Sequence, residues 1–418
     1  MGLIVDLAYC LAALACAPVL LVTGLRRGRH RTDWGARLGR GPTLPPATRP
    51  RVLLHAVSVG EVNLIRPLVL RLLDDPEPLE VVVASTTDTG HRRALDLFED
   101  RCPVVRYPLD LSASVERVLD RLRPDLFASV ELEVWPNFTR ACRRRGIPQL
   151  VINGRLSERS HRGYRRIRPL IAPIFRRLDR VAAQDEVYAD RFRDLGVLPE
   201  RVEVLGTMKW DAARIESAVP GSDALGRQLG IDPDRMLVVA GSTAPDEHEL
   251  LHRSVPDGVQ LLCAPRRPEW FDDAARALPG CARRSTGDRG SATDRFLLDT
   301  MGELRPAYGL ATVVVVGRSF GTLHGSDMME PAALGRPVVV GPSTGDFAST
   351  VEQLLAGDGL VVSDRTRLAG DLAHLLGDED RRRTLGAHAV EVVRANQGAT
   401  ERTVALIRER LAGGRPDG

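Results

Sequence analysis

Lysine is almost absent from this chain of 418 residues: of its 58 basic residues, all but Lys209 are arginine. A protein that uses arginine nearly everywhere accepts it wherever a positive charge is enough. The single lysine therefore indicates a position that needs a compact, mobile ammonium instead of a planar guanidinium. The alternative is chance survival of one lysine at the surface, because surface cations are largely interchangeable. Lys209 is a candidate functional residue on composition alone.

Other scarce features exclude whole classes of protein. Aromatic residues make up 4% of the chain and its formal net charge is +3, too little stacking surface and too little charge for a nucleic-acid-binding protein. The six cysteines lack Cys-x-x-Cys spacing, so neither a zinc site nor a disulfide framework is expected, and most of the chain is expected in the reducing cytosol. No Gly-x-Gly-x-x-Gly follows an expected strand, which counts against a nicotinamide-dependent enzyme.

Two regions of the chain alternate short apolar runs with helical segments, which is the pattern of parallel α/β domains. The first extends over residues 51–215 and the second over residues 222–412, with a polar stretch around Pro220 and Gly221 between them. With 43% hydrophobic residues, the chain is long enough for two cores. The expected fold class is α/β, with two Rossmann-like domains preceded by a basic, proline-rich linker over residues 26–50.

The N-terminal residues 1–25 are expected to form a transmembrane anchor. Leu3 to Leu25 is apolar apart from Asp6 and is long enough to span a bilayer. Five basic residues follow between positions 26 and 31, and the positive-inside rule places this flank and the rest of the chain in the cytoplasm, on the inner membrane. A cleaved signal peptide is the alternative, but no positively charged segment precedes the apolar run.

The stretch from Arg51 to Val62 contains the first candidate for a catalytic base. It begins as a buried apolar strand, passes through small residues and becomes helical from Glu61. Open α/β sheets bind their ligands at such strand–loop–helix joints, so Glu61 is expected to act as a general base. The alternative is a carboxylate that only complements the dipole of the helix it begins.

A second acidic segment, Val130-Glu-Leu-Glu-Val-Trp-Pro-Asn137, follows another expected strand. Glu131 and Glu133 lie on one side of an extended chain, close enough to perturb each other if both are buried. Pro136 is expected to open the next helix. The alternative is that one glutamate caps this helix while Trp135 packs against its surroundings.

The second α/β region contains three candidate positions for an anionic ligand. Arg266 follows Pro265 at the carboxyl end of an expected strand, where a guanidinium can pair with phosphate. The backbone N–H groups of 301–304 begin a helix and can bind an anion. Glu330, also before a helix, suits two ribose hydroxyls, or it complements the helix dipole and does nothing more.

The segment His55-Ala-Val-Ser-Val-Gly-Glu61 closely resembles the opening motif of the Kdo transferases, membrane-anchored enzymes that add 3-deoxy-D-manno-octulosonic acid (Kdo) to lipid A precursors. Further matches to this family recur in order between Arg51 and Ala399. They are Ser85-Thr-Thr-Asp-Thr-Gly90, Glu131-Leu-Glu-Val-Trp-Pro136, Asn153-Gly-Arg-Leu-Ser-Glu-Arg-Ser160, Gly206-Thr-Met-Lys-Trp-Asp211, Pro265-Arg-Arg-Pro-Glu269 and Thr300-Met-Gly-Glu-Leu304.

The resemblance implies an inverting transfer of Kdo from CMP-Kdo to a lipid A precursor, lipid IVA, in lipopolysaccharide biosynthesis. It implies the GT-B arrangement, two Rossmann-like domains facing a cleft, with the C-terminal helices packing back on the first domain. It gives Glu61 the role of base, Glu131 a transition-state role and Lys209 a contact with the donor phosphate. No metal is expected, because no Asp-x-Asp pair of the metal-binding kind appears and a monophosphate leaving group can be neutralised by cations and N–H groups. The donor-binding residues implied are Pro265, Arg266, Met301, Gly302, Glu303, Leu304, Asp327 and Glu330.

The chain departs from the family pattern at several positions. Thr207 replaces Asn, Arg267 and Trp270 replace His and Arg, and the usual Gly-Gly-His-Asn-x-x-Glu-Pro reads with Ser326 for His and Asp327 for Asn. A carboxylate beside a phosphate repels it unless it is paired. Two alternatives therefore remain: a transferase of another nucleotide sugar, such as a UDP-hexose, and a non-catalytic, membrane-bound, glycolipid-binding relic.

The anchor hypothesis has a direct test. The full-length protein should sediment with membranes, and a reporter fused to its C-terminus should be active in the cytoplasm, because the basic flank follows the apolar run. Activity of the reporter in the periplasm alone would contradict this orientation.

Overall fold

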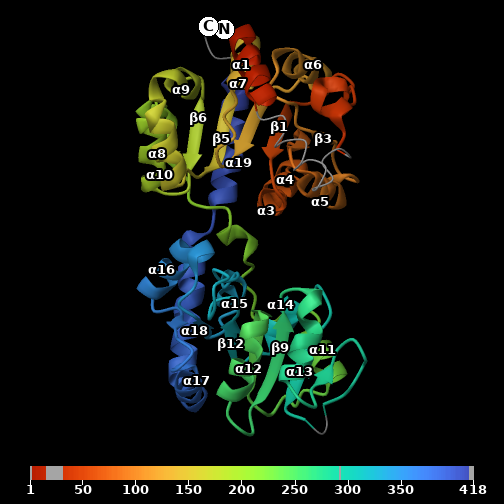
Figure 1. Cartoon of the computed structure of the whole chain (residues 1–418), viewed down its shortest axis with the longest axis vertical. Helices are drawn as coiled ribbons and strands as arrows, with labels where there is room; N and C mark the ends of the chain where they lie inside the picture. The colour runs from red at the N-terminus through yellow and green to blue at the C-terminus, as the bar shows by residue number, and fades with distance from the viewer. Residues whose placement is uncertain (1, 16–31, 291–292, 414–418) are drawn as a thin grey trace. The chain divides into compact units, whose positions relative to one another are not determined.

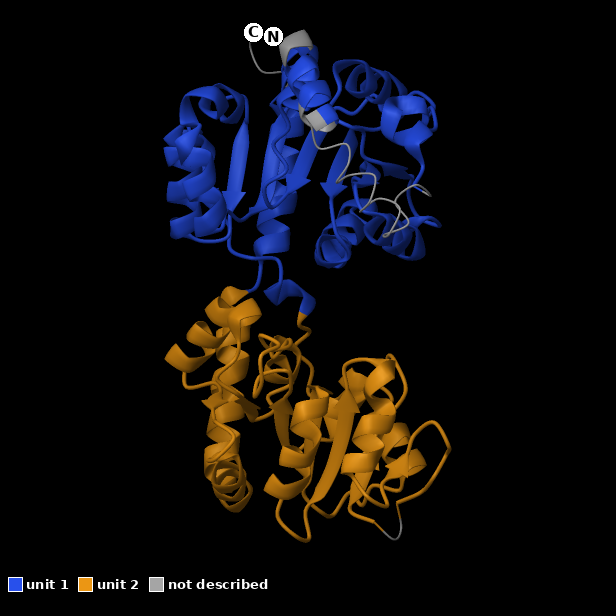
Figure 2. Ribbon diagram, viewed as in Figure 1, with its two compact units in different colours: residues 1–212, 397–418 blue, residues 213–396 orange. Residues whose placement is uncertain are grey.

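The computed structural model describes residues 2–15, 32–290 and 293–413. The chain forms two compact units, shown in different colours in Figure 2. Unit 1 comprises Met1–Ala212 and Gln397–Gly418, and unit 2 comprises Ala213–Asn396. The chain thus enters unit 2 once, leaves it once, and returns to unit 1 for its last helix.

Unit 1 is built on a parallel sheet of seven strands in the order β3-β2-β1-β4-β5-β6-β7. The residues of β1 and β4 are buried throughout, as expected for parallel strands covered on both faces. The strands, which confirm the apolar runs of the sequence, are β1 (Arg51–Ala56), β2 (Glu80–Ser85), β3 (Val104–Arg106), β4 (Leu126–Val130), β5 (Gln149–Gly154), β6 (Arg180–Ala183) and β7 (Val202–Val204).

Helices cover both faces of this sheet (Figure 1). Successive residues of β1 point to opposite faces, so Leu54 belongs to a core shared with α4 and α19, and Leu53 to a second core shared with α6 and α7. The helices are α1 (Gly2–Ala15), η2 (Ala36–Arg40), α3 (Val59–Leu64), α4 (Arg66–Leu73), α5 (Asp88–Phe98), α6 (Ser112–Leu122), α7 (Pro136–Arg145), α8 (Glu158–Arg166), α9 (Arg168–Phe175), α10 (Glu186–Asp194), η3 (Pro199–Arg201), η4 (Trp210–Ala212) and α19 (Ala399–Ala412).

Unit 2 repeats this plan with the strand order β10-β11-β9-β8-β12-β13-β14, again entirely parallel. Its strands are β8 (Leu237–Thr243), β9 (Gln260–Pro265), β10 (Ala282–Arg283), β11 (Arg295–Leu297), β12 (Val313–Val316), β13 (Val338–Val340) and β14 (Val361–Val362). Its helices are α11 (Ser222–Leu229), α12 (Pro245–Ser254), η5 (Pro268–Trp270), α13 (Phe271–Ala277), α14 (Leu304–Leu310), α15 (Met329–Ala333), η6 (Gly345–Phe347), α16 (Ala348–Ala356), α17 (Leu368–Gly377) and α18 (Glu379–Asn396).

In each sheet the strand order reverses beside the first strand. In unit 1 the first strand, β1, is hydrogen-bonded to β2 on one side and to β4 on the other. In unit 2 the first strand, β8, is bonded to β9 on one side and to β12 on the other. Beyond the carboxyl ends of β1 and β4, and of β8 and β12, the loops leave toward opposite faces of the sheet. Open α/β sheets bind ligands at these positions.

Two helical regions are interrupted. The helix expected from Glu61 onward begins at Val59 and breaks at Ile65 into α3 and α4, because Pro67 has no N–H and fits only the first turn of a new helix. The long helical region after residue 378 breaks into α18 and α19 at Gly398, whose φ of 96° is left-handed.

The last helix is fastened to unit 1 by a side chain of the Gly206–Asp211 motif. The Asp211 carboxylate accepts hydrogen bonds from the backbone N–H groups of Gly398 and Thr400, both at 2.6 Å. It therefore caps the start of α19 from a distant part of the sequence. The Gln397 side chain adds a bond of 3.1 Å to the carbonyl of Trp210, which is buried.

The N-terminal helix α1 makes polar contacts with unit 1. Asp6 accepts from the N–H of Ser112 at 3.0 Å and from the Asn137 amide at 2.8 Å, and the Tyr9 hydroxyl donates to Asp110 at 3.0 Å. Within residues 2–15, 32–290 and 293–413, no helix combines the length and the apolar character that crossing a bilayer requires. The second half of the expected anchor lies in residues 16–31, outside the described residues, so the anchor stays a prediction.

Candidate functional site

Glu61 lies at the strand-order reversal of unit 1, in the first turn of α3, the helix that follows β1. One of its carboxylate oxygens accepts from the N–H of Val57 at 2.8 Å and the other from the hydroxyl of Ser58 at 2.9 Å. Ser58 in turn accepts from the N–H of Glu61 at 3.4 Å and so caps the start of α3. The structural role that sequence alone suggested for Glu61 is thus present in the fold.

The same carboxyl is also in an environment that suits a base. Burial raises the pKa of Glu61, the two hydrogen bonds oppose that shift, and the charges of Glu131 and Glu133 add to it. These two carboxylates follow β4, the strand adjacent to β1, so both acidic motifs lie at the same opening of the sheet. A carboxyl with a raised pKa at such an opening is typical of catalytic bases.

Glu131 is held in a strained backbone conformation. Its φ of 60° is left-handed, which costs a residue other than glycine about 1 kcal/mol. Its N–H donates to the carbonyl of Ile152 at 3.0 Å, which continues the ladder to β5 for one residue beyond the strand. Strain of this kind persists where the surrounding structure dictates it, and it is concentrated at functional sites.

The acidic residues after β4 do not cap α7. Glu133 instead accepts from the indole N–H of Trp135 at 2.7 Å, and burial raises the pKa of Glu133 above its usual value. The cap comes from Asp110, whose two carboxylate oxygens accept from the N–H groups of Asn137 at 3.0 Å and Phe138 at 2.8 Å. The expected alternative, a glutamate cap, is therefore wrong, and Asp110 is a site-supporting residue that the sequence analysis missed.

His55, which begins the opening motif, has a structural position. Its side chain is completely buried, its ring stacks on that of Tyr107 with the centroids 3.6 Å apart, and its Nε2 lies 2.8 Å from the hydroxyl of Thr86. Burial lowers the pKa of His55 to about 3, so the imidazole is neutral at physiological pH. Of the two ionisable residues in the motif, only Glu61 is suited to exchange a proton.

Lys209 lies in a turn that is tied to the carboxyl end of β5. Asn153, whose φ of 51° is left-handed, accepts from the N–H of Met208 at 3.0 Å. Thr207, which replaces the family's Asn, accepts from the N–H of Lys209 at 3.3 Å. Within the described part of the chain, the half-buried Lys209 ammonium forms no ion pair within 4.0 Å, whereas many of the arginines do.

In unit 2 the candidate donor-binding residues follow three of the strands. Arg266 is exposed directly after β9, and its N–H donates at 3.0 Å to the carbonyl of Thr243, the last residue of β8. The two departures from the motif around it contact each other: the Arg267 guanidinium lies over the ring of Trp270, 5.0 Å from its centroid. They form a cation–π pair and leave Arg266 in place.

The 301–304 segment has a positively charged neighbour of its own. Glu303 forms an ion pair of 3.0 Å with Arg284 and also accepts from the hydroxyl of Thr300. Gly302 has a φ of 91°, which requires glycine, and Met301 is 61% exposed. The pairing with Arg284 offsets the charge of Glu303 beside the N–H groups that would face a phosphate.

Glu330 and Asp327 lie at the start of α15. Glu330 is half-buried and 3.4 Å from Arg305, which also pairs with Glu216 at 2.9 Å. The carboxylate of Asp327 accepts from the N–H of Met329 at 2.8 Å. Ser326, where the family has His, is 4% exposed, and its hydroxyl has no hydrogen-bond partner within the described chain.

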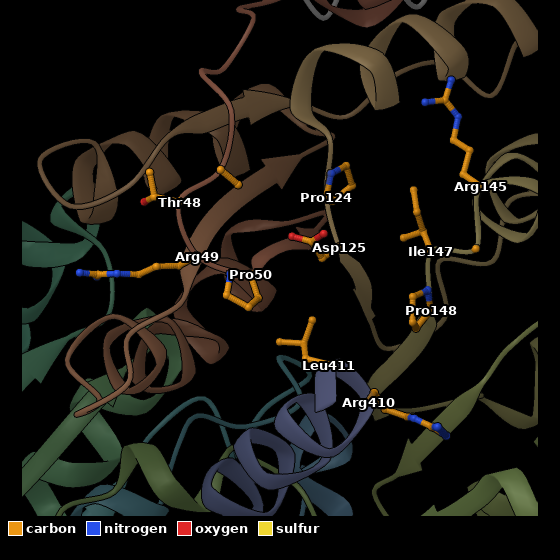
Figure 3. Close-up of a pocket in the computed structure, with 12 residues that line it drawn as sticks. Thr48, Arg49, Pro50, Pro124, Asp125, Arg145, Ile147, Pro148, Arg410 and Leu411 are labelled. Atoms are coloured by element: carbon orange, nitrogen blue, oxygen red, sulfur yellow. The ribbon is translucent and has the colours of Figure 1, made fainter. Parts of the chain in front are cut away.

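A cavity of about 470 Å³ in unit 1 lies away from all of these side chains. Figure 3 shows residues that line it. Pro50, Asp125 and Pro148, which immediately precede β1, β4 and β5, line it together with Arg410 and Leu411 of α19. Its walls are prolines, backbone and outward-pointing arginines, and no predicted site residue contributes to it.

Comparison with known proteins identifies close relatives over nearly the whole chain. A family model described as 3-deoxy-D-manno-octulosonic-acid transferase (kdotransferase) matches residues 32–212. The 3-deoxy-D-manno-octulosonic acid transferase of Haemophilus influenzae is 31% identical over 422 residues, covering 96% of this chain and 98% of the relative. That of Bordetella pertussis is also 31% identical, covering 96% and 99%, and that of Chlamydia muridarum is 26% identical, covering 96% and 95%.

Solved structures with the same fold are more distant in sequence. A glycosyltransferase from Rickettsia africae aligns with a TM-score of 0.58 at 11% identity, covering 87% of this chain and 99% of its own. MurG from Acinetobacter baumannii aligns with a TM-score of 0.55 at 15% identity, covering 86% and 99%. Both likenesses concern the fold, two parallel-sheet α/β units of the GT-B type. They confirm this part of the expected fold class, whereas the expected N-terminal transmembrane helix stays a prediction.

The role of Glu61 can be tested with Glu61→Gln. Glutamine can still accept from the Val57 N–H and donate to the Ser58 hydroxyl, so folding should change little. It cannot accept a proton, so turnover should fall at least about a hundredfold. In the wild-type protein kcat/KM should fall as the pH drops through the raised pKa of Glu61, above the range of an ordinary glutamate, because the base must be ionised. Glu186→Gln, an exposed acid in the first turn of α10, is the matched control. More than a tenth of the wild-type rate in Glu61→Gln would exclude Glu61 as the base.

Lys209→Arg tests whether the single lysine is required as lysine. Charge is conserved, but a guanidinium cannot occupy the position of a compact ammonium, so turnover should fall about tenfold or more. Arg214→Lys, an exposed position in the adjacent segment, makes the reverse exchange and should leave the rate unchanged. Full activity of Lys209→Arg in a steady-state assay would make Lys209 a chance survivor.

Proposed function

The chain belongs to the 3-deoxy-D-manno-octulosonic acid transferase family and is a glycosyltransferase, and we propose that it transfers Kdo from CMP-Kdo to a hydroxyl of a lipid A precursor. The observation that carries the proposal is the position of Glu61, a carboxyl of raised pKa at the strand-order reversal of unit 1, beside Glu131 and Glu133. The expected alternative of a non-catalytic relic does not agree with this family membership.

In the proposed reaction, Glu61 removes the proton from the acceptor hydroxyl as its oxygen attacks the anomeric carbon of the donor. The bond to CMP breaks on the opposite side, so the configuration inverts. The strained Glu131 directs its negative charge at the oxocarbenium character of the transition state. The proton leaves on Glu61, and CMP leaves with the bonding electrons.

The residues of unit 2 are proposed to bind CMP. The Arg266 guanidinium and the N–H groups of Met301, Gly302, Glu303 and Leu304 suit the phosphate, and Glu330, oriented by Arg305, suits the ribose hydroxyls. The Lys209 ammonium adds a positive charge for the leaving phosphate. A monophosphate can be neutralised by these groups, so we propose that no metal is required.

The acceptor is proposed to be lipid IVA at the cytoplasmic face of the inner membrane. The helices α8 and α9 present exposed arginines together with Ile167, 46% exposed, and Leu170, 74% exposed. Guanidinium groups interleaved with aliphatic side chains suit a phosphorylated glycolipid at a membrane surface. The arginines of this segment are Arg155, Arg159, Arg162, Arg165, Arg166 and Arg168.

A second candidate is the transfer of a different sugar. The observation in its favour is Ser326, a buried hydroxyl without a partner where the family has His, next to Asp327 in place of Asn. A buried polar group without a partner is costly unless a ligand or a water satisfies it. These two departures leave Arg266 and Glu330 in place.

Nucleotide binding and product mass separate the two candidates. CMP should raise the Tm of the protein without added divalent metal, because a ligand at about 100 times its Kd contributes about 2.7 kcal/mol to the folded state. Incubation with CMP-Kdo and tetraacyl lipid A precursor should then yield a product heavier by one or more Kdo residues in the mass spectrum. A Tm shift with UDP but none with CMP would favour the second candidate.

A further inference from the structure

Glu247 is a completely buried carboxylate that has no role in the proposed reaction. It lies in the first turn of α12, its side chain is 0% exposed, and within the described residues it forms no ion pair. Burying a charge in this way is costly unless hydrogen bonds replace the lost water. The contacts that compensate this buried charge therefore have to be identified.

Four backbone N–H groups satisfy this carboxylate. Oε2 accepts from Ala244 at 2.9 Å and from Arg318 at 2.8 Å. Oε1 accepts from Ser319 at 2.9 Å and from Phe320 at 3.0 Å. Ala244 belongs to the loop after β8, and the other three belong to the loop after β12, so one side chain connects the two loops that diverge at the strand-order reversal of unit 2.

The two loops approach each other so closely that their geometry has little freedom. A Cβ atom at Gly317 would lie 2.5 Å from the Cα of Thr243 and 2.8 Å from Oε2 of Glu247, so only glycine fits there. Ser242, near the end of β8, and Arg318, in the loop after β12, have left-handed φ values of 57° and 59°. Residues other than glycine keep this conformation only where their surroundings impose it, and the buried carboxylate is the contact that the two loops share.

The bonds of Glu247 extend to residues proposed to bind the donor. The carbonyl of Thr243, next to Ala244, accepts from the N–H of Arg266 at 3.0 Å. On the other side, the carbonyl of Ser319 accepts from the N–H of Ser343 at 2.9 Å, and its hydroxyl accepts from the N–H of Gly341 at 2.7 Å, after β13. Glu247 thus joins the carboxyl ends of β8 and β12 directly, and the bonds of Thr243 and Ser319 extend this connection to β9 and β13.

We propose that Glu247 is the positioning residue of the donor site: its carboxylate sets the separation of the loops after β8 and β12, and so sets the affinity for the nucleotide, without touching it. The inference rests on the proposed function, in that the ligand of these loops is taken to be the nucleotide of the donor. It assigns to unit 2 a residue whose counterpart in unit 1 is Glu61, since each lies in the first turn of the helix after the first strand and accepts a backbone N–H from a residue that precedes this helix.

The number of bonds distinguishes these two glutamates. Glu61 is only partly buried and accepts two hydrogen bonds, whereas Glu247 is completely buried and accepts four. The Glu61 carboxylate can therefore still accept a proton from a ligand. The oxygens of Glu247 are already occupied by backbone N–H groups. The same position has therefore been adapted to chemistry in one unit and to positioning in the other.

Glu247→Gln tests the proposal, because an amide has one oxygen and can satisfy only one of the two pairs of N–H groups. Hydrogen exchange should accelerate at either Ala244 and Arg318 or Ser319 and Phe320, with core strand amides unchanged. The KM for CMP-Kdo and the Kd of CMP should rise at least about tenfold, because misplaced loops lose binding geometry. The KM for the lipid acceptor should stay as in the wild type, since its residues lie in unit 1.

Two control variants separate positioning from general stability. Glu249→Gln changes an exposed carboxylate on the same helix and should behave as the wild type. Leu372→Ala leaves a cavity in the core of unit 2 and should lower Tm without changing either KM at a temperature where the protein is folded. Gly317→Ala forces the loops apart while Glu247 stays intact, so it should reproduce the donor defect even if Glu247→Gln does not fold.

Unchanged exchange at all four amides of Glu247→Gln would overturn the proposal, as would faster exchange with an unchanged KM for CMP-Kdo and Kd of CMP. If Glu247→Gln does not fold, an unchanged donor KM in Gly317→Ala would overturn it as well. A wild-type protein that neither binds CMP nor transfers Kdo would contradict the proposed function, and the exchange measurement would then decide by itself whether Glu247 holds the two loops.

Discussion

A parallel sheet covered by helices on both faces has to reverse its strand order once, and this constraint places the candidate site in each unit. The loops after β1 and β4, and after β8 and β12, diverge from neighbouring strands, so their amides have no strand to pair with. The carboxylates of Glu61 and Glu247 occupy these two openings and accept N–H groups from the loops beside them. The other site residues are positioned by loops that start at the same edge of a sheet.

Much of this arrangement follows from the sequence, because buried parallel strands read as apolar runs and their carboxyl ends share one edge. The runs at β1 and β4 were sufficient to place Glu61 and Glu131 each after a buried strand, and the pairing of these strands brings the two residues to one opening. Contacts between distant segments left no such signal. Asp110 caps α7 and Asp211 caps α19, and neither is near its helix in the sequence. Propensity and periodicity are local properties, whereas these caps depend on the tertiary fold.

Glu61 and Glu247 have similar sequence contexts but different environments in the fold, and the sequence does not predict this difference. Ser58-Val-Gly-Glu61 and Ala244-Pro-Asp-Glu247 both follow a first strand and begin a helix, so the pattern assigns them the same role. Whether such a carboxylate can still accept a proton from a ligand depends on the neighbouring loop. The loop after β12 turns three N–H groups toward Glu247, whereas the loop after β4 brings two further carboxylates toward Glu61. The resulting difference in burial and charge is a property of the fold.

The bonds that join Trp210 and Asp211 to residues 397–400 have a consequence for how the protein can change over evolution. Because they hold together the two places where the chain leaves and re-enters unit 1, unit 2 is an insertion whose entry and exit are neighbours (Figure 2). Insertions with adjacent ends are tolerated well, since replacing them requires only a short closure of the host. Unit 2, which is proposed to bind the nucleotide, can therefore diverge, or be exchanged for that of a relative, while the unit that carries Glu61 keeps its fold.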